Sequence, residues 1–303
     1  MHASLALPTA VAAATAAINA DDLITGVEDL LSLPDAAIRL NAVLTDPDAS
    51  VNDIAAIVSV DPALSARVLR AVNSAYFGLR GRVDTITKAI AMIGTSELHS
   101  LVLATSAALA FKNISSKLMD MESFWQHSVR AALAARGFAE SGSLRRHRER
   151  VFLSALMHDV GKLVLYHQLP DLSVRVLEAV KAGRVQDEVE LEVLGFTHAE
   201  VGALLLERWN LPTSITMPVR FHHRFEEASD FAKEAALVHL GSRVSHLMEQ
   251  ERSAEQAPYL DVEPEAWAQA GCSPSELEEV MVDVDMHWLQ VIEIVAPGSI
   301  MIY

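Results

Sequence analysis

The stretch Ala155-Leu156-Met157-His158-Asp159-Val160-Gly161-Lys162-Leu163-Val164 places an adjacent histidine and aspartate inside an apolar, helix-like run. A charged side chain that is removed from water costs free energy unless it is paired or bound to a metal. The His158-Asp159 pair therefore indicates one of two structures. It belongs either to a metal site or to a closed network of hydrogen bonds, and the rest of the chain decides which partners it has.

Helix signals dominate the remainder of the sequence, and strand signals are nearly absent. Ser50 and Asp53 have the spacing of a helix-capping pair. Asp61-Pro62 opens a helix that Gly78 is placed to close. Thr197 can cap the helix that follows it. The sequence thus predicts an all-α fold, with further helices over 34–44, 85–93, 95–111, 123–139, 148–157, 159–167, 198–209, 214–223, 230–248 and 274–295.

Composition favours a protein of the reducing cytoplasm. The chain has 303 residues, 51% of them hydrophobic, which is enough for a sizeable core. Its single cysteine, Cys272, excludes an intrachain disulfide framework. No run approaches the roughly 18 apolar residues of a membrane span. The Ala-rich start, Met1 to Ala20, has no Lys or Arg, so it reads as a helical or disordered lead rather than a signal peptide.

The charge is strongly acidic and uneven. The formal net charge is −16, and residues 249–303 hold twelve acidic side chains against one basic residue, Arg252. This balance disfavours direct binding of nucleic acid through its phosphates. One basic cluster, Arg145 to Arg150, is either a solvated loop before a helix or a contact for an anionic ligand or partner.

Histidines supply the candidate partners of the opening pair. A lone histidine is more often a structural residue than a ligand, but several on separate helices can converge on one metal, since imidazole and carboxylate are common ligands. Lys162, one turn after His158, either contacts a phosphate oxygen or lies at the helix surface. The candidate ligands are His127, His158, Asp159, His198, His222 and His223. The histidines expected to be structural are His99, His147, His167, His239, His246 and His287.

Leu156 to Lys162 resembles the signature of the HD superfamily of metal-dependent phosphohydrolases. Several separated motifs, in order, are more specifically similar to the HDOD domain, a bacterial signalling module related to HD and HD-GYP proteins. The similarity covers about residues 25–248. Its motifs are Leu31-Ser32-Leu33-Pro34, the segment from Asp61 to Gly78, Ala89-Ile90-Ala91-Met92-Ile93-Gly94, the segment from Phe196 to Ala203, Trp209-Asn210-Leu211-Pro212 and His222-His223.

The resemblance implies an N-terminal helical bundle packed on an HD-like helical bundle, with an acidic C-terminal helical extension. Polar stretches near 112–122 and 250–262 suit the boundaries. The expected organisation is an N-terminal lead over 1–24, the first bundle over 25–115, the HD-like bundle over 116–250 and the extension over 251–303.

The resemblance also implies a divalent transition metal, namely Fe, Mn, Zn or Ni. His127 fits the first ligand of the HD superfamily, and His158 with Asp159 fits the pair. The later His198, His222 and His223 resemble the extra ligands of binuclear HD-GYP sites. The chain departs from the pattern at Ser242, which stands where the last aspartate is expected. It also has no Gly-Tyr-Pro motif after the histidine pair.

Two functions follow from this resemblance. HDOD domains are generally regulatory and often non-catalytic, so the first is a signalling module that binds a protein partner or a small anionic ligand. The missing carboxylate at Ser242 favours this interpretation, because its loss weakens a metal site that activates water. The second is a metal-dependent phosphohydrolase of phosphoesters or nucleotides, in which Asp159 and Lys162 are catalytic.

Overall fold

The computed structural model describes residues 19–27, 31–44, 49–114, 117–250 and 260–298. These residues are mostly helical and none of them forms a strand, which confirms the all-α prediction. Within this part of the chain, no helix is long and apolar enough to cross a membrane. The predicted N-terminal lead over residues 1–24 falls mostly outside the described residues, which begin at Asn19.

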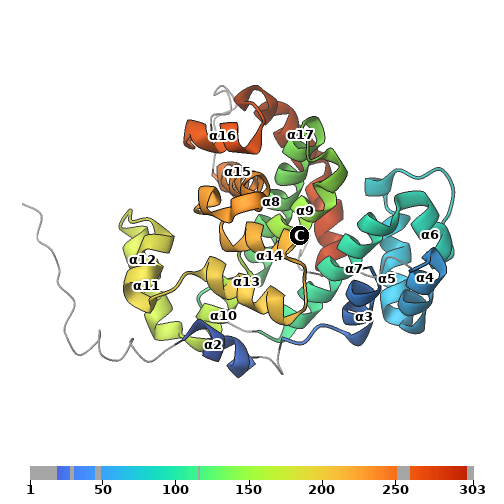
Figure 1. Ribbon diagram of the computed structural model, residues 1–303, viewed down its shortest axis with the longest axis horizontal. Coiled ribbons are helices and arrows are strands. Elements are labelled where there is room, and N and C mark those ends of the chain that lie inside the picture. Colours follow the sequence, from blue (N-terminus) through green and yellow to red (C-terminus); the bar gives the residue numbers. More distant parts are fainter. Residues whose placement is uncertain (1–18, 28–30, 45–48, 115–116, 251–259, 299–303) are drawn as a thin grey trace, which may run out of the picture.

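Helices of the first third pack against one another and form the N-terminal group (Figure 1). Within this group α7 makes the most extensive contact with the rest of the molecule, because it packs on α9 (Arg148–Met157) and on the last helix, α17 (Leu277–Val295). The N-terminal group comprises α3 (Asp35–Leu44), α4 (Val51–Val60), α5 (Pro62–Val72), the short 3-10 turn η1 (Ala75–Phe77), α6 (Ile86–Ile93) and α7 (Thr95–Ala110).

A second group of helices surrounds the opening motif. In it α8 packs along α15 and α9, while α13 contacts both α10 and α14. Its members besides α9 are α8 (Met121–Ser141), α10 (Val160–Gln168), α13 (His198–Arg208), α14 (Thr213–Arg220) and α15 (Ala232–Glu249). Around them lie α2 (Ala20–Val27), α11 (Pro170–Lys181), α12 (Gln186–Leu194) and α16 (Pro264–Ala270), of which the sequence predicted none.

Local capping fixes several of the predicted helix starts. The Ser50 hydroxyl accepts a hydrogen bond from the Asp53 amide, and the Asp53 carboxylate accepts one from the Ser50 amide at 2.9 Å. The Asp61 carboxylate accepts hydrogen bonds from the amides of Ala63 and Leu64, both at 2.9 Å. These bonds satisfy amides that have no partner inside the helix, so the predicted caps are confirmed.

The end of α5 differs from the prediction. The helix stops at Val72, and Gly78, with φ of +57°, ends only the short turn η1. The cause is Asn73, whose side-chain amide donates to the carbonyls of Leu69 and Val83, both at 2.7 Å, and accepts from the Val83 amide. Asn73 thereby turns the chain five residues before the glycine.

Hydrogen bonds tie the N-terminal part to the second group. The Trp209 indole donates to the Leu31 carbonyl at 2.7 Å, and the Asn41 amide donates to the carbonyl of Asn210. Asn210 has a φ of +57°, a left-handed conformation that asparagine tolerates better than most residues. These bonds join motifs that are far apart in the sequence.

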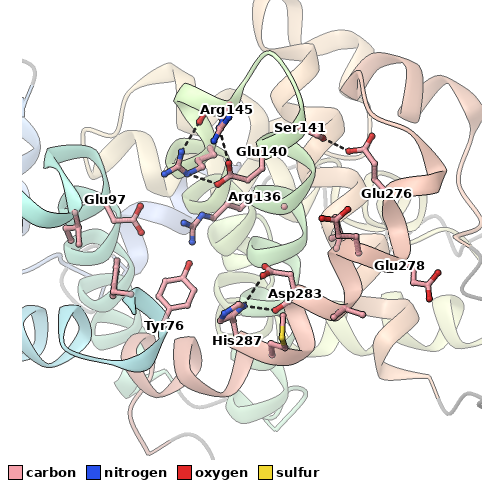
Figure 2. A pocket seen from close by; sticks show the side chains of 18 of the residues that line it. Tyr76, Glu97, Arg136, Glu140, Ser141, Arg145, Glu276, Glu278, Asp283 and His287 are labelled. Atoms are coloured by element: carbon pink, nitrogen blue, oxygen red, sulfur yellow. Dashed lines mark hydrogen bonds and ion pairs between the residues drawn. The ribbon is translucent and has the colours of Figure 1, made fainter. Parts of the chain in front are cut away.

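The acidic extension returns to both groups. The helix α17 packs on α8 and also contacts α5, α7 and η1. Between α17, α8 and the N-terminal group lies a cavity of about 1160 Å³, called here the α17 groove (Figure 2). The boundaries expected near 112–122 and 250–262 lie between α7 and α8 and between α15 and α16, and residues 115–116 and 251–259 are outside the described chain.

Candidate metal centre

The opening motif forms the junction of two helices. His158 is the C-cap of α9 and Asp159 is the N-cap of α10, so both side chains leave the turn toward the protein interior. His158 is fully buried and Asp159 is 4% exposed. The Nδ1 atom of His158 donates to the Ala155 carbonyl at 2.6 Å, which leaves the lone pair of Nε2 directed at the site.

Gly161 lets the next part of the site come close. A Cβ atom at this position would lie 1.9 Å from the His198 carbonyl oxygen and 2.6 Å from the Gly202 amide nitrogen. Only glycine permits this approach of α10 to α13. As a result His198, at the start of α13, has its Nε2 atom 3.2 Å from Asp159 Oδ1.

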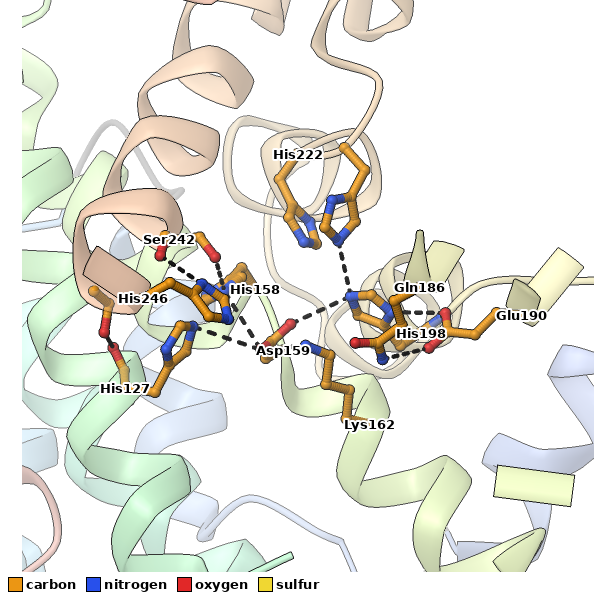
Figure 3. Close-up of polar contacts among 12 residues, drawn as sticks. His127, His158, Asp159, Lys162, Gln186, Glu190, His198, His222, Ser242 and His246 are labelled. Atoms are coloured by element: carbon orange, nitrogen blue, oxygen red, sulfur yellow. Dashed lines mark hydrogen bonds and ion pairs between the residues drawn. The ribbon is translucent and has the colours of Figure 1, made fainter. Parts of the chain in front are cut away.

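Two groups of ligand-type atoms meet on either side of Asp159 (Figure 3). The first joins Asp159 to His127 and His158, whose Nε2 atoms lie 3.8 Å and 3.6 Å from Asp159 Oδ2. The second is His198, His222 and His223, with the Nε2 atoms of His198 and His223 3.2 Å apart. In each group the ligand atoms lie within 4.8 Å of one another. These residues, with Lys162, are called the histidine centre.

Hydrogen bonds orient the imidazoles of the histidine centre. His222 Nδ1 donates to the Val219 carbonyl at 2.7 Å, and His127 Nδ1 lies 2.9 Å from Glu249 Oε1. The opposite nitrogens, Nε2 of His127 and of His222, are buried and have no hydrogen-bond partner among the described residues. A ring held at one nitrogen, with the other buried and unpaired, is the usual state of a metal-binding histidine.

Electrostatics keep a negative charge at the middle of the histidine centre. Burial alone raises the pKa of Asp159, but its neighbours His158, Lys162 and His198 outweigh burial and hold that pKa well below its ordinary value. Burial also opposes a charge on Lys162, yet the adjacent Asp159 raises the pKa of the ammonium group. The Lys162 Nζ atom donates to Asp159 Oδ2 at 2.7 Å, so this lysine lies on the site and is turned onto the carboxylate.

The histidines differ in charge. Burial lowers the pKa of His158 to about 3 and that of His222 well below its ordinary value. For His198, burial acts in the same direction but the Glu190 carboxylate outweighs it and raises the pKa to about 9. His158 and His222 are therefore neutral at pH 7, as a metal ligand must be.

Ser242 lies where the missing carboxylate would complete the first group. Its Oγ atom is 3.2 Å from His158 Nε2, and because Nδ1 of that ring donates elsewhere, the hydroxyl donates here. The structure thus places Ser242 beside the pair, as the resemblance implied. A neutral hydroxyl supplies no charge to a divalent ion.

Three polar residues at the site escaped the sequence analysis. Glu190 is 1% exposed, and one of its oxygens accepts from both the amide and the Nδ1 of His198 at 2.7 Å. Glu249 holds His127 as described above. His246, set aside as structural, has its ring centroid 4.5 Å from that of His127, and its Nδ1 lies 2.9 Å from the Ser242 carbonyl. Spacing on α15 was the available signal, because positions 242, 246 and 249 share one helix face.

The residues present fit a metal ion. Two groups of nitrogen and carboxylate ligands, oriented rings and unpaired buried Nε2 atoms are the features that a transition-metal site requires. His127, His158 and Asp159 would hold one ion, and His198, His222 and His223 would supply ligands for another. Among the other histidines, His239 Nδ1 lies 2.9 Å from the His222 carbonyl and supports the turn that carries the histidine pair.

Known proteins share this fold and sequence pattern. A protein of Treponema pallidum named "Uncharacterized protein" is 26% identical over 234 residues, which are 77% of this chain and 45% of that protein. The chain thus spans less than half the length of this relative. A crystal structure named "Putative phosphohydrolase" from Shewanella amazonensis SB2B is 26% identical, with a TM-score of 0.72 over 91% of this chain and 97% of that one.

An HDOD domain protein of Geobacter sulfurreducens, whose function is unknown, has the same fold. Its TM-score is 0.70 at 23% identity, over 93% of this chain and 97% of that one. The family match itself is to the HDOD domain and covers residues 30–225, more than half of the sequence. It includes the His158-Asp159 pair, His198 and the adjacent histidines. The chain therefore belongs to the HDOD domain family.

Proposed function

We propose that this chain is a regulatory signalling domain that acts by binding a protein partner or a small ligand, and that its histidine centre holds a divalent transition metal without hydrolysing phosphate esters. The observation that carries the proposal is the contact between Ser242 Oγ and His158 Nε2 at 3.2 Å. A hydroxyl occupies the place of a ligand that would otherwise bring a second negative charge to the first group.

The position of Lys162 supports the same conclusion. Its ammonium group is bonded to Asp159 Oδ2 at 2.7 Å and is mostly buried. A lysine that binds a phosphate oxygen needs its charge directed at the substrate. Here that charge neutralises the one carboxylate of the first group, which reduces the attraction for a hard cation. Of the expected metals Fe, Mn, Zn and Ni, this favours Fe, Zn and Ni, because they prefer imidazole.

A second candidate, a metal-dependent phosphohydrolase, is favoured by the two adjacent ligand groups. When bound there, a metal would supply Lewis acidity and a water of lowered pKa. Asp159 would orient that water and Lys162 would leave Asp159 to contact the phosphate. The named phosphohydrolase from Shewanella amazonensis, similar over almost its whole length, supports this candidate as well.

Metal content and turnover separate the two candidates. The purified protein is analysed for bound metal, and phosphomonoesters and cyclic nucleotides are then offered with added Mn²⁺. We expect bound metal without turnover. Turnover that disappears in Asp159→Ala would overturn the regulatory proposal, and a folded protein without metal affinity would overturn the metal-binding part of it.

The substitution Ser242→Asp tests the missing ligand directly. A carboxylate at this position adds one negative charge to the first group, so we expect metal affinity to rise by about tenfold or more in calorimetric titration. Ser242→Asn is the matched control, because it has nearly the same shape and no charge. Equal affinities of the aspartate and asparagine variants would contradict the placement of Ser242 as the absent ligand.

A further inference from the structure

The α17 groove is larger than most small-molecule pockets and has an apolar floor. Its volume of about 1160 Å³ lies above the range of roughly 300–1,000 Å³ found for small-molecule sites. The floor is formed by Tyr76 and Phe77 of η1, Met92 of α6, and Val282 and Met286 of α17. Figure 2 shows the groove open between α17 on one side and the N-terminal group on the other.

The apolar residues that line the groove are far more exposed to solvent than the residues of a hydrophobic core. Met92, Val282 and Met286 are 49%, 53% and 60% exposed. Leu289, one turn further along α17, is also exposed, so this helix shows apolar residues at 282, 286 and 289. Single exposed apolar residues are common, but a row at helical spacing beside a groove indicates an interaction site.

One wall of the groove is basic, and most of its positive charge is compensated by neighbouring carboxylates. Arg136 Nε lies 3.3 Å from Glu149 Oε1. Arg148 Nε lies 3.0 Å from Glu140 Oε1, and Arg145 Nε lies 3.5 Å from Glu140 Oε2. Three arginines on this wall thus share the two carboxylates Glu140 and Glu149, which leaves one positive charge.

The opposite wall, α17, has a negative charge that is not compensated. The helix contains no Lys or Arg. Its exposed Glu278 and Glu279 form no ion pair among the described residues, whereas Asp283 is paired with His287 at 3.1 Å. Glu97, on the N-terminal side, adds no charge at pH 7, since burial and the nearby Glu149 raise its pKa to about 9. With Glu276 and Asp283 counted, the ionised carboxylates at the groove outnumber its three arginines, so the net field attracts cations.

We propose that the α17 groove binds an amphipathic helical segment of a partner protein, with apolar side chains seated on Met92, Val282 and Met286 and basic side chains directed at Glu278 and Glu279. The row of apolar residues on α17 matches the i, i+4, i+7 anchors of a second helix laid along it. This assignment rests on the proposed regulatory function and gives it a partner class. The bound segment would touch both the N-terminal group and α8, so its binding would depend on the relative position of the two.

A defined peptide serves as the probe. It is a fluorescein-labelled helix of about 18 residues, close to the length of α17, with leucines at i, i+4 and i+7 and lysines on the flanks. Two companion peptides keep the leucines with glutamates in place of lysines, or keep the lysines with serines in place of leucines. We expect saturable binding of the first peptide, and binding at least about tenfold weaker for each companion.

Variants locate the binding. Glu278→Lys/Glu279→Lys and, separately, Met286→Glu are each expected to weaken binding of the lysine peptide by about tenfold or more. The matched control is Glu226→Lys/Glu265→Lys, which makes the same change of net charge at exposed positions on other elements and is expected to bind normally. Should the first double variant fail to fold, Glu278→Gln/Glu279→Gln removes both charges without reversing them.

Three outcomes overturn the groove assignment: equal binding of the lysine and glutamate peptides, equal weakening by the control variant, and unchanged binding by Met286→Glu. Metal titration of the same preparations keeps the two proposals apart. Loss of peptide binding with normal metal affinity overturns the groove alone. Phosphate ester turnover in a protein that still binds the peptide overturns the regulatory proposal and leaves the groove intact.

Discussion

Asp159 in the histidine centre and Glu97 at the α17 groove are both carboxyl groups shielded from water, and their surroundings leave Asp159 ionised and Glu97 neutral at pH 7. Lys162 and His198 lie against Asp159, and the pKa of that carboxyl stays well below its ordinary value. Glu97 is half-buried beside Glu149, which already accepts ion pairs from two arginines, and burial together with Glu149 raises its pKa to about 9. Burial raises the pKa of both carboxyl groups, so the difference between their pKa values comes from the neighbouring charges.

The difference separates what each region can bind. The histidine centre keeps a fixed negative charge in a closed interior, where a metal ion can replace the proton of His198 or the ammonium group of Lys162 as its partner. At the groove the half-buried carboxyl group of Glu97 is neutral at pH 7, and the carboxylates without an ion pair among the described residues, Glu278 and Glu279, lie at the surface. A charged side chain of a partner can reach these without being buried.

The largest effect is expected from removing the charge of the histidine centre. Asp159→Asn leaves the buried ammonium group of Lys162 without its carboxylate, while His198 keeps Glu190, and this should lower the free energy of unfolding by about 3–5 kcal/mol. Metal affinity should fall by about 100-fold. Urea unfolding and calorimetric titration measure the two effects. Adding Lys162→Met should restore part of the stability and none of the metal affinity. A stable single variant with normal affinity would contradict this account of the centre.

A smaller effect tests how tightly each region is packed. In Gly161→Ala the new methyl group meets the backbone of His198 and Gly202, which cannot yield, so α10 and α13 must separate at a cost of about 2–3 kcal/mol. In Gly137→Ala, on the groove side of α8, the methyl group lies 3.3 Å from the Val280 methyl groups, which can shift. Thermal unfolding should show a large loss for the first and little change for the second. Equal losses of stability in the two variants would contradict the claim that the contact of α10 with α13 is packed more tightly than the groove side of α8.

Much of the fold followed from local signals, because capping and apolar spacing act over a few residues. The pairs Ser50 with Asp53 and Thr197 with Glu200 both form reciprocal caps. The ligand-type residues of the histidine centre were chosen from their types and positions, the family resemblance assigned them places in a ligand set, and the structure brings together all six. Their role as metal ligands stays a prediction.

What escaped prediction depends on tertiary packing. In Val189-Glu190-Leu191-Glu192-Val193 apolar and acidic residues alternate, and nothing local distinguishes the buried Glu190 from the exposed Glu192. The two glutamates are distinguished only by the position of α12 in the fold, which places Glu190 against His198. The groove could not be predicted from the sequence either, because Val282 and Met286 have the spacing of core residues. Their exposure is known only once α17 has used its opposite face, with Val280 and Val284, against the molecule.

The smallest effect concerns pH and the raised pKa of Glu97. A group with a raised pKa in the folded state binds its proton more tightly there than in the unfolded chain. Its contribution to stability is complete below the ordinary pKa of about 4.5 and is lost as the pH rises toward about 9.

Glu97→Gln keeps a donor for Glu149 and cannot ionise. We therefore expect the variant to gain stability relative to the parent as pH rises from 5 to 9, by about 1 kcal/mol once the effect is reduced for the solvent that screens the half-buried Glu97. Urea unfolding across this range measures the difference, and Glu188→Gln, at an exposed position on α12, corrects for the loss of one ionisable group. If the stability difference between the variant and the parent does not vary with pH, Glu97 is ionised in the folded protein. Glu97 and Asp159 would then carry the same charge, and the contrast between the two regions would be wrong.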